Sequence, residues 1–400
     1  MSVEQFDGVV VAGAGPVGLF AALGLARAGV PVLVVEALEA IPRSPRAIVY
    51  HPPTLRVLDR LGVLADGLQV GVCKYDYQFR DRAGTVLARM NIRVLAGLTD
   101  YLYNLHLGQH VLSEIILRHL LRLPHAQVRW NRRVTAVEQD ATGVTITLAA
   151  GSATERLRGA WLIGADGARS GVRRALAIPF AGHTWPERFV ATNVYFDFER
   201  YGFARANFVV DPEDWAIVPI LSPDGMWRVT YQEDAALSED EVLRRIPARY
   251  RVLLPGPEPY ELVAAASYRV HERAAARFRK GRVLLAGDAA HVCNPTGGYG
   301  LTGGLLDAVA LAEVLAAVVH GDADDGVLDV YAQERRRVFL EVSSPGASEN
   351  KRRLAERDPA RKRRDAEHFR RLNEDPAYER EALAYSFKLA GNPMPVPARF

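Results

Sequence analysis

Residues Asp7 to Ala37 read DGVVVAGAGPVGLFAALGLARAGVPVLVVEA, and this stretch decides the fold. Residues 9–12 form a short apolar run typical of a buried strand, and residues 16–28 place apolar side chains at helical spacing. Gly29 ends that helix, and the apolar run at residues 30–36 follows as a second strand. The order strand, tight turn, helix, strand predicts a βαβ unit with two parallel strands.

The turn of this unit fits the pattern G-x-G-x-x-G with Gly13, Gly15 and Gly18. The first glycine permits the tight turn, the second lets the backbone approach a pyrophosphate, and the third lets helix and strand pack closely. Glu36 ends the second strand 23 positions after Gly13, where a carboxylate can bind a ribose hydroxyl. The unit predicts dinucleotide binding, and a structural turn with an incidental glutamate is the alternative. FAD and NAD are not separated here, although Glu36 argues against a 2′-phosphate at this position.

The composition is that of an ordinary folded enzyme. Of the 400 residues, 49% are hydrophobic and 24% are charged, and the formal net charge is +3. A chain of this length predicts more than one lobe. Because the charge is nearly balanced, we expect no nucleic-acid partner. The few lysines are Lys74, Lys280, Lys351, Lys362 and Lys388.

The cysteines and the apolar runs bear on metal chemistry and location. Cys73 and Cys293 make no ligand-spaced pair, so we predict reduced thiols and no metal site. The first residues, MSVEQFDG, lack the basic and apolar regions of a signal peptide. No uninterrupted apolar run reaches the roughly 18 residues that a membrane span requires. These features predict a cytoplasmic protein with no membrane partner.

Two further motifs follow along the chain. In LRGAWLIGADGARSGVRRAL (residues 157–176), a buried strand runs into Asp166-Gly167, and a helix opens after Ser170. In GRVLLAGDAAHVCNPTGGYGLTGGLLDAVALAEVL (residues 281–315), a strand runs into Gly287-Asp288, and a glycine-rich loop leads to a helix from about Gly303. Backbone N–H groups of such a loop can contact the anionic edge of a flat ring.

With its three motifs in this order, the chain resembles the FAD-dependent aromatic hydroxylases of the p-hydroxybenzoate hydroxylase fold, which are single-component flavoprotein monooxygenases. The resemblance spans roughly residues 6–345. It implies an α/β fold: a Rossmann-like FAD-binding domain with a parallel sheet, interleaved with an α+β substrate domain built on an antiparallel sheet, plus C-terminal helices.

The expected domains are discontinuous. The FAD-binding domain takes residues 1–75, 105–180 and 272–345, and the substrate-binding domain takes residues 76–104 and 181–271. In residues 189–234 short apolar runs alternate with turns, as in an antiparallel sheet, and the hairpin at residues 78–90 belongs to the same sheet. Residues 346–400 interleave arginine with acids, so we expect solvated helices broken near Pro359 and Pro376, covering the flavin lobe or making dimer contacts.

The resemblance also implies the cofactor contacts. The glycine turn would hold the FAD pyrophosphate, Glu36 the adenosine ribose, and Asp288 the ribityl or pyrophosphate region. Asp166 is associated with both FAD and nicotinamide nucleotide binding. The expected cofactor-binding residues are Gly13, Gly15, Pro16, Val17, Gly18, Glu36, Arg46, Gln109, Asp166, Gly287, Asp288, Gly300, Leu301 and Thr302.

The implied reaction is hydroxylation of a small, electron-rich aromatic substrate. NADPH or NADH reduces FAD, O₂ adds to give a flavin C4a-hydroperoxide, and one oxygen passes to the ring. The expected catalytic residues are Pro295, Arg228 and His106, and either His106 or a tyrosine could act as a base toward a phenol or amine. The protein is expected to be a monomer or homodimer. Candidate residues lining the substrate pocket are Tyr103, Tyr195, Asn207, Trp215, Tyr231 and Tyr299.

Two departures and two alternatives remain open. The family usually has the motif G-Q-G-[ML]-N where this chain has Gly298-Tyr299-Gly300-Leu301-Thr302. The departures are therefore Tyr299 in place of Gln and Thr302 in place of Asn. A halogenase or an isoprenoid reductase would share the fold. Halogenases of this fold carry the motif W-x-W-x-I-P and an essential lysine. Here DWAIVPIL (residues 214–221) matches that motif only in part, and Lys74 is the single lysine in residues 50–110. A non-catalytic FAD-bound pathway partner is the second alternative.

Overall fold

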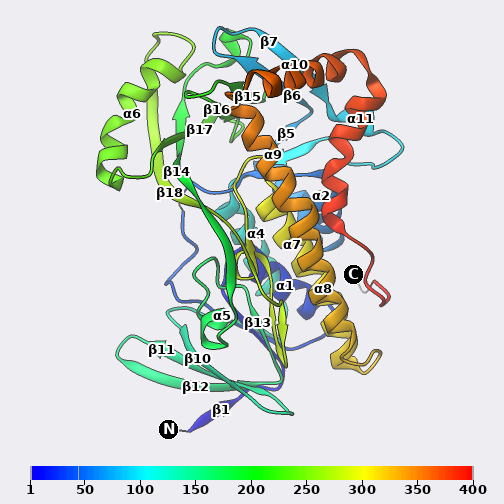
Figure 1. The fold of residues 1–400 in the computed structure, drawn as a ribbon. Coiled ribbons are helices and arrows are strands. Elements are labelled where there is room, and N and C mark those ends of the chain that lie inside the picture. The colour runs from blue at the N-terminus through cyan, green and yellow to red at the C-terminus, as the bar shows by residue number, and fades with distance from the viewer. Residues whose placement is uncertain (1, 44, 399–400) are drawn as a thin grey trace.

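The computed structural model describes residues 2–43 and 45–398. Figure 1 shows an elongated molecule with a parallel sheet in its lower half, a mixed sheet in its upper half, and C-terminal helices along one side. The α/β fold with a parallel sheet, an antiparallel-type sheet and C-terminal helices is thereby confirmed. The domain boundaries stay a prediction, and one strand, β18 (Glu261–Ala275), crosses the boundary expected at residues 271–272.

The lower half is built on a six-stranded sheet. Its strand order is β19-β20-β13-β2-β3-β9, and every neighbouring pair is parallel except β19 with β20. Four of the six strands are entirely buried, as expected for a parallel sheet that is covered on both faces. The bounds are β2 (Val9–Ala12), β3 (Val32–Val35), β9 (Ala126–Arg129), β13 (Trp161–Gly164), β19 (Arg279–Lys280) and β20 (Val283–Leu285).

Helix α1 (Pro16–Arg27) packs against both α4 (Gln109–Leu120) and α7 (Tyr299–His320). Together with the sheet they enclose the largest apolar core. The other helices of this half are α2 (Pro52–Arg60), α3 (Leu64–Val70), α5 (Gly171–Ala175) and α8 (Val327–Val338). A second sheet lies at the bottom of Figure 1, with β1 (Val3–Gln5), β10 (Arg133–Gln139), β11 (Val144–Ala150) and β12 (Ala153–Gly159).

The upper half is built on an eight-stranded sheet, ordered β21-β18-β14-β17-β16-β15-β6-β7. All its pairs are antiparallel except β15 with β6, and the expected hairpin is present as β6 and β7. The strands β14 (16 residues) and β18 (15 residues) pair along their lengths and run down into the lower half (Figure 1). The remaining bounds are β6 (Asp76–Asp81), β7 (Val86–Asn91), β14 (Phe180–Tyr195), β15 (Ala206–Val210), β16 (Ala216–Pro219), β17 (Met226–Asp234), β21 (His291–Val292) and helix α6 (Glu239–Leu253).

A small three-stranded sheet joins the two halves. It is ordered β4-β8-β5 and consists of β4 (Val49–Tyr50), β5 (Val72–Lys74) and β8 (Asn104–His106). The expected breaks in the C-terminal segment are confirmed, because Pro359 and Pro376 each stand at the first turn of a helix. That segment forms α9 (Ser344–Leu354), α10 (Pro359–Glu374) and α11 (Pro376–Ala384). Single turns occupy Ile92–Leu95, Glu199–Tyr201, Gly287–Ala289, Phe339–Ser343 and Tyr385–Ala390.

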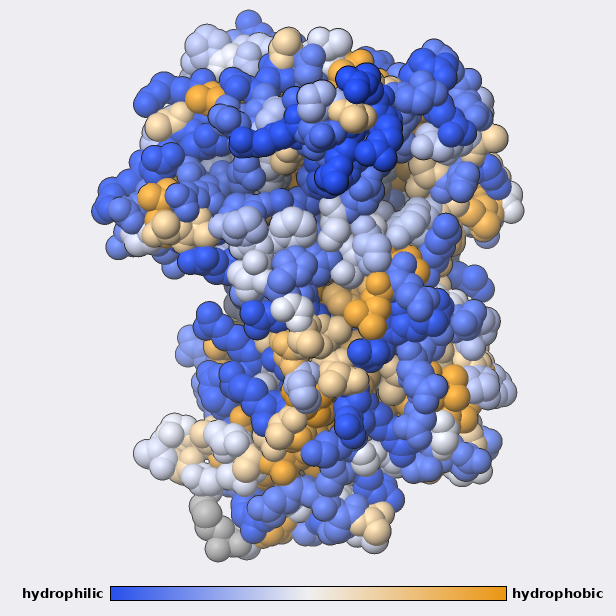
Figure 2. All heavy atoms as spheres, in the orientation of Figure 1, coloured by the Kyte–Doolittle hydropathy of each residue, from blue (hydrophilic) through white to orange (hydrophobic). Residues whose placement is uncertain are grey.

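Helix α7 corrects two sequence-based expectations. It begins at Tyr299 rather than near Gly303, because Gly298 adopts a left-handed φ of 72° as N-cap and the later glycines are accommodated inside the helix. By length and composition α7 is also apolar enough to cross a membrane, since only Asp307 and Glu313 interrupt it. However, 78% of its most apolar stretch is buried inside the protein, as in a core helix. On the face in Figure 2, hydrophobic residues gather midway down the molecule, and both ends are mostly hydrophilic.

Candidate active site

One cavity of about 1080 Å³ runs between the two halves of the molecule. At one end, which we call the cofactor end, the wall contains the glycine turn after β2, Asp288 and the start of α7. At the other, the substrate end, it contains His51, Tyr77, His106 and Tyr299. A single small-molecule site usually takes about 300–1,000 Å³, so the cavity has room for a cofactor and a small ring together.

The glycine turn fits a pyrophosphate. A Cβ on Gly13, whose φ is 109°, would collide with the backbone oxygen of Ala165, and a Cβ on Gly18 would collide with the backbone of Gly13. Gly15 differs, because nothing lies within 4 Å of the position its Cβ would take, and that space belongs to the cavity. Pro16 opens α1, whose first N–H groups therefore face the gap. The backbone thus leaves room for an anionic group at the helix start.

Two carboxylates stand at the carboxyl ends of parallel strands beside this turn. Glu36 accepts hydrogen bonds from the backbone N–H of Ala14 (2.7 Å) and of Leu38 (2.9 Å), which fixes it at the cavity wall. Asp166 accepts from the N–H of Gly171 (2.6 Å) and from the Ser170 hydroxyl, so it holds the start of α5. The geometry supports a ribose contact for Glu36 and a scaffold role for Asp166.

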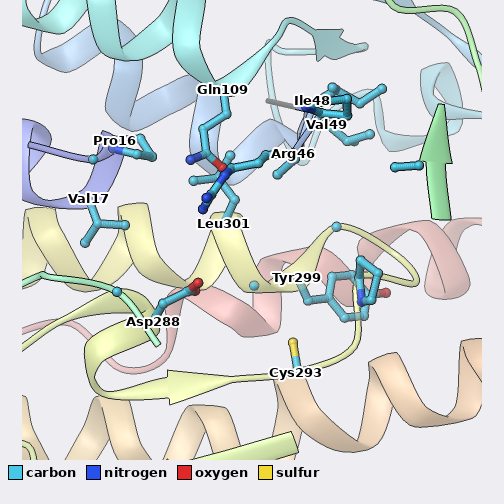
Figure 3. A pocket seen from close by; sticks show the side chains of 18 of the residues that line it. Pro16, Val17, Arg46, Ile48, Val49, Gln109, Asp288, Cys293, Tyr299 and Leu301 are labelled. Atoms are coloured by element: carbon cyan, nitrogen blue, oxygen red, sulfur yellow. The ribbon is translucent and has the colours of Figure 1, made fainter. Parts of the chain in front are cut away.

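The turn after β20 presses against α1. Gly287 has a φ of 58°, and a Cβ there would lie 2.9 Å from the side chain of Val17. The next residue, Asp288, points into the cavity beside α7 (Figure 3). Its side chain is open to the cavity rather than to the outer surface, and this burial raises the pKa of the carboxyl.

A buried charged group supports this turn from behind. Asp307 on α7 accepts from the N–H of Gly287 (3.0 Å), and its carboxylate pairs with His291 (2.7 Å) and Arg335 (2.7 Å). Burial by itself would raise the pKa of Asp307, but the two basic partners outweigh it and bring the pKa to about 2. The carboxylate is therefore charged at neutral pH and ties three elements together.

The start of α7 offers backbone donors to the cavity. Because Gly298 is the N-cap, the N–H groups of Tyr299, Gly300 and Leu301 have no acceptor within the helix. Gly300 and Leu301 line the cavity, and Figure 3 shows Leu301 near Gln109 and Arg46. Thr302 does not line it, which corrects the sequence-based expectation: its hydroxyl donates to the carbonyl of Gly298 (3.0 Å), and its N–H lies within the helix.

The opposite wall is held by Arg228. Its guanidinium donates twice to the Asn193 side chain (2.9 and 3.1 Å) and also to the backbone carbonyl of Arg46. Burial lowers the pKa of Arg228 to about 10, so it remains protonated at neutral pH. Arg228 therefore fixes the segment that carries Arg46, and Gln109 opens α4 beside it (Figure 3).

At the substrate end His51, Tyr77 and His106 line the cavity, and the fully buried Asn104 and Lys74 contact Tyr77. We call these five residues the polar cluster. His106 places Nδ1 2.8 Å from the carbonyl of Ile220. Because a carbonyl only accepts, Nδ1 carries the proton, and Nε2 is an acceptor without a partner among the described residues. Burial lowers the pKa of His106 to about 3, so the ring is neutral.

The comparisons with known proteins agree with this geometry. The family model described as FAD binding domain matches residues 7–344. Para-nitrophenol 4-monooxygenase of Pseudomonas sp. (strain WBC-3) is 49% identical over 97% of this chain and 97% of its own length. The chain is an FAD-dependent aromatic hydroxylase.

Two further relatives cover nearly the whole chain. The crystal structure of p-nitrophenol 4-monooxygenase from Pseudomonas putida DLL-E4 superposes with a TM-score of 0.95 at 48% identity, covering 98% of this chain and 100% of its own. The 6-hydroxy-3-succinoylpyridine 3-monooxygenase of Pseudomonas putida (strain DSM 28022 / S16) is 43% identical over 96% of this chain and 98% of its own length. The hydroxylase therefore uses FAD as cofactor and NADPH or NADH as reductant.

The hydroxylase completes its cavity with a segment beyond the family match, which ends at residue 344. Gly346 and Asn350 on α9 stand beside the loop at Gly297, and Tyr385 packs against Tyr299 with ring centroids 5.8 Å apart. A hydrogen bond also joins Asn350 to the Tyr299 hydroxyl. The lining residues from this segment are Pro345, Gly346, Glu349, Asn350, Arg353, His368, Ala382, Leu383, Tyr385 and Ser386.

Most of the expected cofactor residues of the hydroxylase lie together at the cavity, and the expected substrate residues mostly do not. Pro295 lines the cavity, although its carbonyl accepts from the N–H of Gly298 (3.0 Å). Gly18 and Gly287 serve packing instead of lining. The predicted residues that line the cavity are Gly13, Gly15, Pro16, Val17, Glu36, Arg46, His106, Gln109, Asp166, Arg228, Asp288, Pro295, Tyr299, Gly300 and Leu301.

Five predicted lining residues lie outside the cavity, which corrects the sequence analysis. Tyr195 donates to Asp224 (2.6 Å) at the surface, and Tyr103 packs against Tyr75. Trp215 is fully buried against Phe189. Asn207 and Tyr231 are the other two, and both are on strands whose neighbouring residues line the cavity instead. For Asn207 and Tyr231 the cause is that residue type was followed rather than the alternation of faces along a strand.

Sequence reasoning also missed lining residues that the hydroxylase brings from several elements. On β15 the cavity is lined by Ala206 and Phe208, and on β17 by Thr230 beside the expected Arg228, so period-2 spacing was the available signal. Nothing in the local sequence around His51 indicated its position. Other missed residues are Tyr77, Phe79, Met90, Ala191, Ile217, Pro219, Ser267, Tyr268 and Cys293.

Proposed function

We propose that this hydroxylase acts on a phenol or hydroxypyridine at the ring carbon that lies para to the hydroxyl and already carries a substituent. The names of two full-length relatives support this regiochemistry. Position 4 of para-nitrophenol bears the nitro group and lies opposite the hydroxyl. In 6-hydroxy-3-succinoylpyridine, position 3 bears the succinoyl group and lies opposite the hydroxyl at position 6. In both rings the hydroxyl oxygen donates electron density to the carbon that is attacked.

The observation that carries the proposal is the unfilled acceptor on His106. A ring hydroxyl at the substrate end can donate to Nε2, because Nδ1 is already committed to Ile220. On ionisation the hydroxyl proton passes to Nε2, and the resulting imidazolium donates from both nitrogens, to Ile220 and to the phenolate oxygen. His106 is therefore our candidate for the catalytic base, with the phenolate formed beside it offsetting the burial that lowers the pKa of the imidazole.

The remaining chemistry belongs to the cofactor, which, once bound, accepts electrons from NADPH or NADH and activates O₂. The chain supplies binding and orientation. Gly15, Asp288 and the free N–H groups at the start of α7 would hold FAD, while Arg228 fixes the segment of Arg46. The C-terminal segment closes the substrate end and excludes water from the reacting ring.

The test is a substrate panel with purified holoenzyme. Para-nitrophenol is expected to stimulate oxidation of NADPH or NADH and O₂ consumption, to release nitrite, and to incorporate oxygen from labelled O₂. The ortho and meta isomers and para-nitroanisole, which lacks the ionisable hydroxyl, are the controls. Equal turnover of the meta isomer, or nucleotide oxidation that yields only hydrogen peroxide for every compound, would contradict the proposal.

Location and assembly complete the proposal. We place the reaction in the cytoplasm and expect a monomer or homodimer. Light scattering of the purified holoenzyme measures its mass directly, and a larger assembly would contradict this part alone.

A further inference from the structure

The polar cluster contains a chain of hydrogen bonds with a fixed direction. His51 lies with Nε2 2.7 Å from the carbonyl of Gly297, so Nε2 carries the proton and donates. Its Nδ1 is then an acceptor and receives a bond from the side-chain amide of Asn104 (3.3 Å). The same amide nitrogen donates to the hydroxyl oxygen of Tyr77. The direction of each hydrogen bond determines the direction of the next, starting from the Gly297 carbonyl, which can only accept.

This series of hydrogen bonds ends at the hydroxyl of Tyr77, which is left with an unused proton. Because the Tyr77 oxygen receives the bond from Asn104, the hydroxyl proton of Tyr77 is free to point elsewhere. Tyr77 lines the cavity, and no acceptor for that proton is recorded in the part of the chain that the structure describes. A hydroxyl donor at the cavity wall with no acceptor in the protein suits a ligand oxygen.

The ring of Tyr77 is held on both sides. It stacks on Phe208 with ring centroids 6.3 Å apart and an interplanar angle of 16°, and the Lys74 ammonium or amine lies over it. Lys74 is directly opposite Asn104 in the pairing of β5 with β8, and His106 is two residues along β8 on the same face. The free donor of Tyr77 and the free acceptor of His106 therefore belong to one side of the small sheet.

The titratable groups around this donor are mostly neutral, so Tyr77 acts on a ligand as a hydrogen-bond donor. Burial lowers the pKa of Lys74 well below its usual value and the pKa of His51 to about 4, so the cluster carries little positive charge of its own. Burial raises the pKa of Tyr77, so its hydroxyl keeps its proton. The titratable groups that face Tyr77 are His51 after β4, Lys74 on β5, His106 on β8 and Tyr299 on α7, with Asp76 beside Lys74.

Building on the proposed function, we propose that Tyr77 is a catalytic residue that donates a hydrogen bond to the ring oxygen of the substrate, and that Asn104 and His51 aim this donor as positioning residues. The substrate oxygen is then held between Tyr77 and His106. In the phenol form it accepts from Tyr77 and donates to Nε2 of His106. When the O–H bond breaks, the proton forms an N–H bond at Nε2, and the phenolate accepts from both residues. No electrons are transferred in this step.

The arrangement also sets a direction for selectivity. A phenol hydroxyl fills both open positions, because it accepts from Tyr77 and donates to His106, whereas an ether oxygen can accept from Tyr77 but cannot donate to His106. The site thus recognises a ring hydroxyl that ionises, which is the chemistry that activates the para carbon. The carbonyl of Gly297 lies at the far end of the chain, so the donor is fixed to the turn that precedes α7.

The first test is Tyr77→Phe, which removes one hydroxyl from a well-packed ring. The ionisation of bound para-nitrophenol is followed by the absorption band of its phenolate across a pH series, with oxidised FAD in place. Losing a hydrogen bond to an ion is expected to raise the pH midpoint of the bound phenol by about one to two units. Tyr195→Phe, at the surface, is the matched control and should leave the midpoint unchanged.

The second test reverses the direction of the hydrogen bond between residue 104 and Tyr77 without changing the size of the side chain at position 104. In Asn104→Asp the carboxylate accepts the proton of Tyr77, so the tyrosine presents lone pairs to the cavity and repels a phenolate. Weaker binding of para-nitrophenol than in Tyr77→Phe is expected, with FAD content unchanged. Because FAD content is read separately, either variant suffices if the other fails to fold.

The outcomes separate the two proposals. If para-nitrophenol neither binds nor is consumed by the wild-type enzyme, then the proposed function has failed and takes this inference with it. If it is hydroxylated, but its ionisation midpoint is the same in the wild type and in Tyr77→Phe, then the assignment of Tyr77 is overturned while the proposed function stands.

Discussion

At the cofactor end of the cavity the wall is mostly backbone, whereas at the substrate end it is mostly side chain. Gly15 and the first turn of α7 present N–H groups and empty space, so what matters there is the absence of a Cβ. His106, Tyr77 and Asn350 present specific donors and acceptors at the other end. The backbone end suits a cofactor shared by a whole family, and the side-chain end suits one substrate. The difference teaches where substitutions will abolish binding and where they will retune it.

The largest effect is expected from Gly15→Val. Nothing in the fold lies within 4 Å of the new Cβ, so the protein should fold, but the side chain occupies the space left for the pyrophosphate. FAD affinity is expected to fall at least about 100-fold, or roughly 3 kcal/mol. Bound flavin is measured by absorbance after gel filtration, with circular dichroism as the check on folding. A yellow, stoichiometric Gly15→Val protein would remove the distinction between the two ends.

Asp307→Asn tests what supports the cofactor end from behind. The amide cannot balance the buried charge of Arg335, so a loss of about 3 kcal/mol of stability at neutral pH is expected. The folded-state pKa of Asp307 is depressed to about 2 from a usual 3.8, so its contribution is present above about pH 4 and disappears as the pH falls toward 2. Thermal melting of both proteins should converge across that window. A constant difference down to pH 2 would show that charge is not the cause.

Asn350→Ala probes the substrate end. It removes the partner of the Tyr299 hydroxyl, which is buried at the cavity wall. The KM for the phenol is expected to rise about tenfold, consistent with roughly 1–2 kcal/mol for a buried group left unpaired, while FAD affinity stays unchanged. Steady-state kinetics and flavin titration measure the two quantities. Lys362→Met, on the exposed face of α10, is the control. Weaker FAD binding with an unchanged KM would reverse the assignment of the two ends.

The smallest effect is expected from Tyr195→Phe. Sequence analysis placed this residue in the pocket, but its hydroxyl is bound to Asp224 at the surface. Turnover and KM are expected to match the wild type, and stability should change by no more than about 0.5 kcal/mol. A large rise in KM would restore the sequence-based assignment and contradict the cavity as described.

The same contrast explains what could be predicted from the sequence. The cofactor end is encoded by short contiguous motifs, so Gly13, Gly15 and Asp288 were found, as was the fold they belong to. The substrate end depends on contacts between distant segments: His51 meets Gly297 across 246 positions, and Asn350 reaches the loop from a helix beyond the family match. No local sequence pattern predicts contacts between residues so far apart in the chain. Strand parity would have excluded Asn207 and Tyr231 but would not have pointed to His51 or Asn350.

The C-terminal segment is synthesised last, which orders the assembly of the cavity in time. Residues 345–386 emerge from the ribosome after every lining residue of the cofactor end, the last of which is Leu301. During synthesis the nascent chain therefore completes the flavin pocket while the opposite side of the cavity still lies open. Residues of α9, α10 and α11 then complete the wall of the cavity. Vectorial synthesis thus orders the completion of the two walls, with the cofactor end ahead of the C-terminal segment.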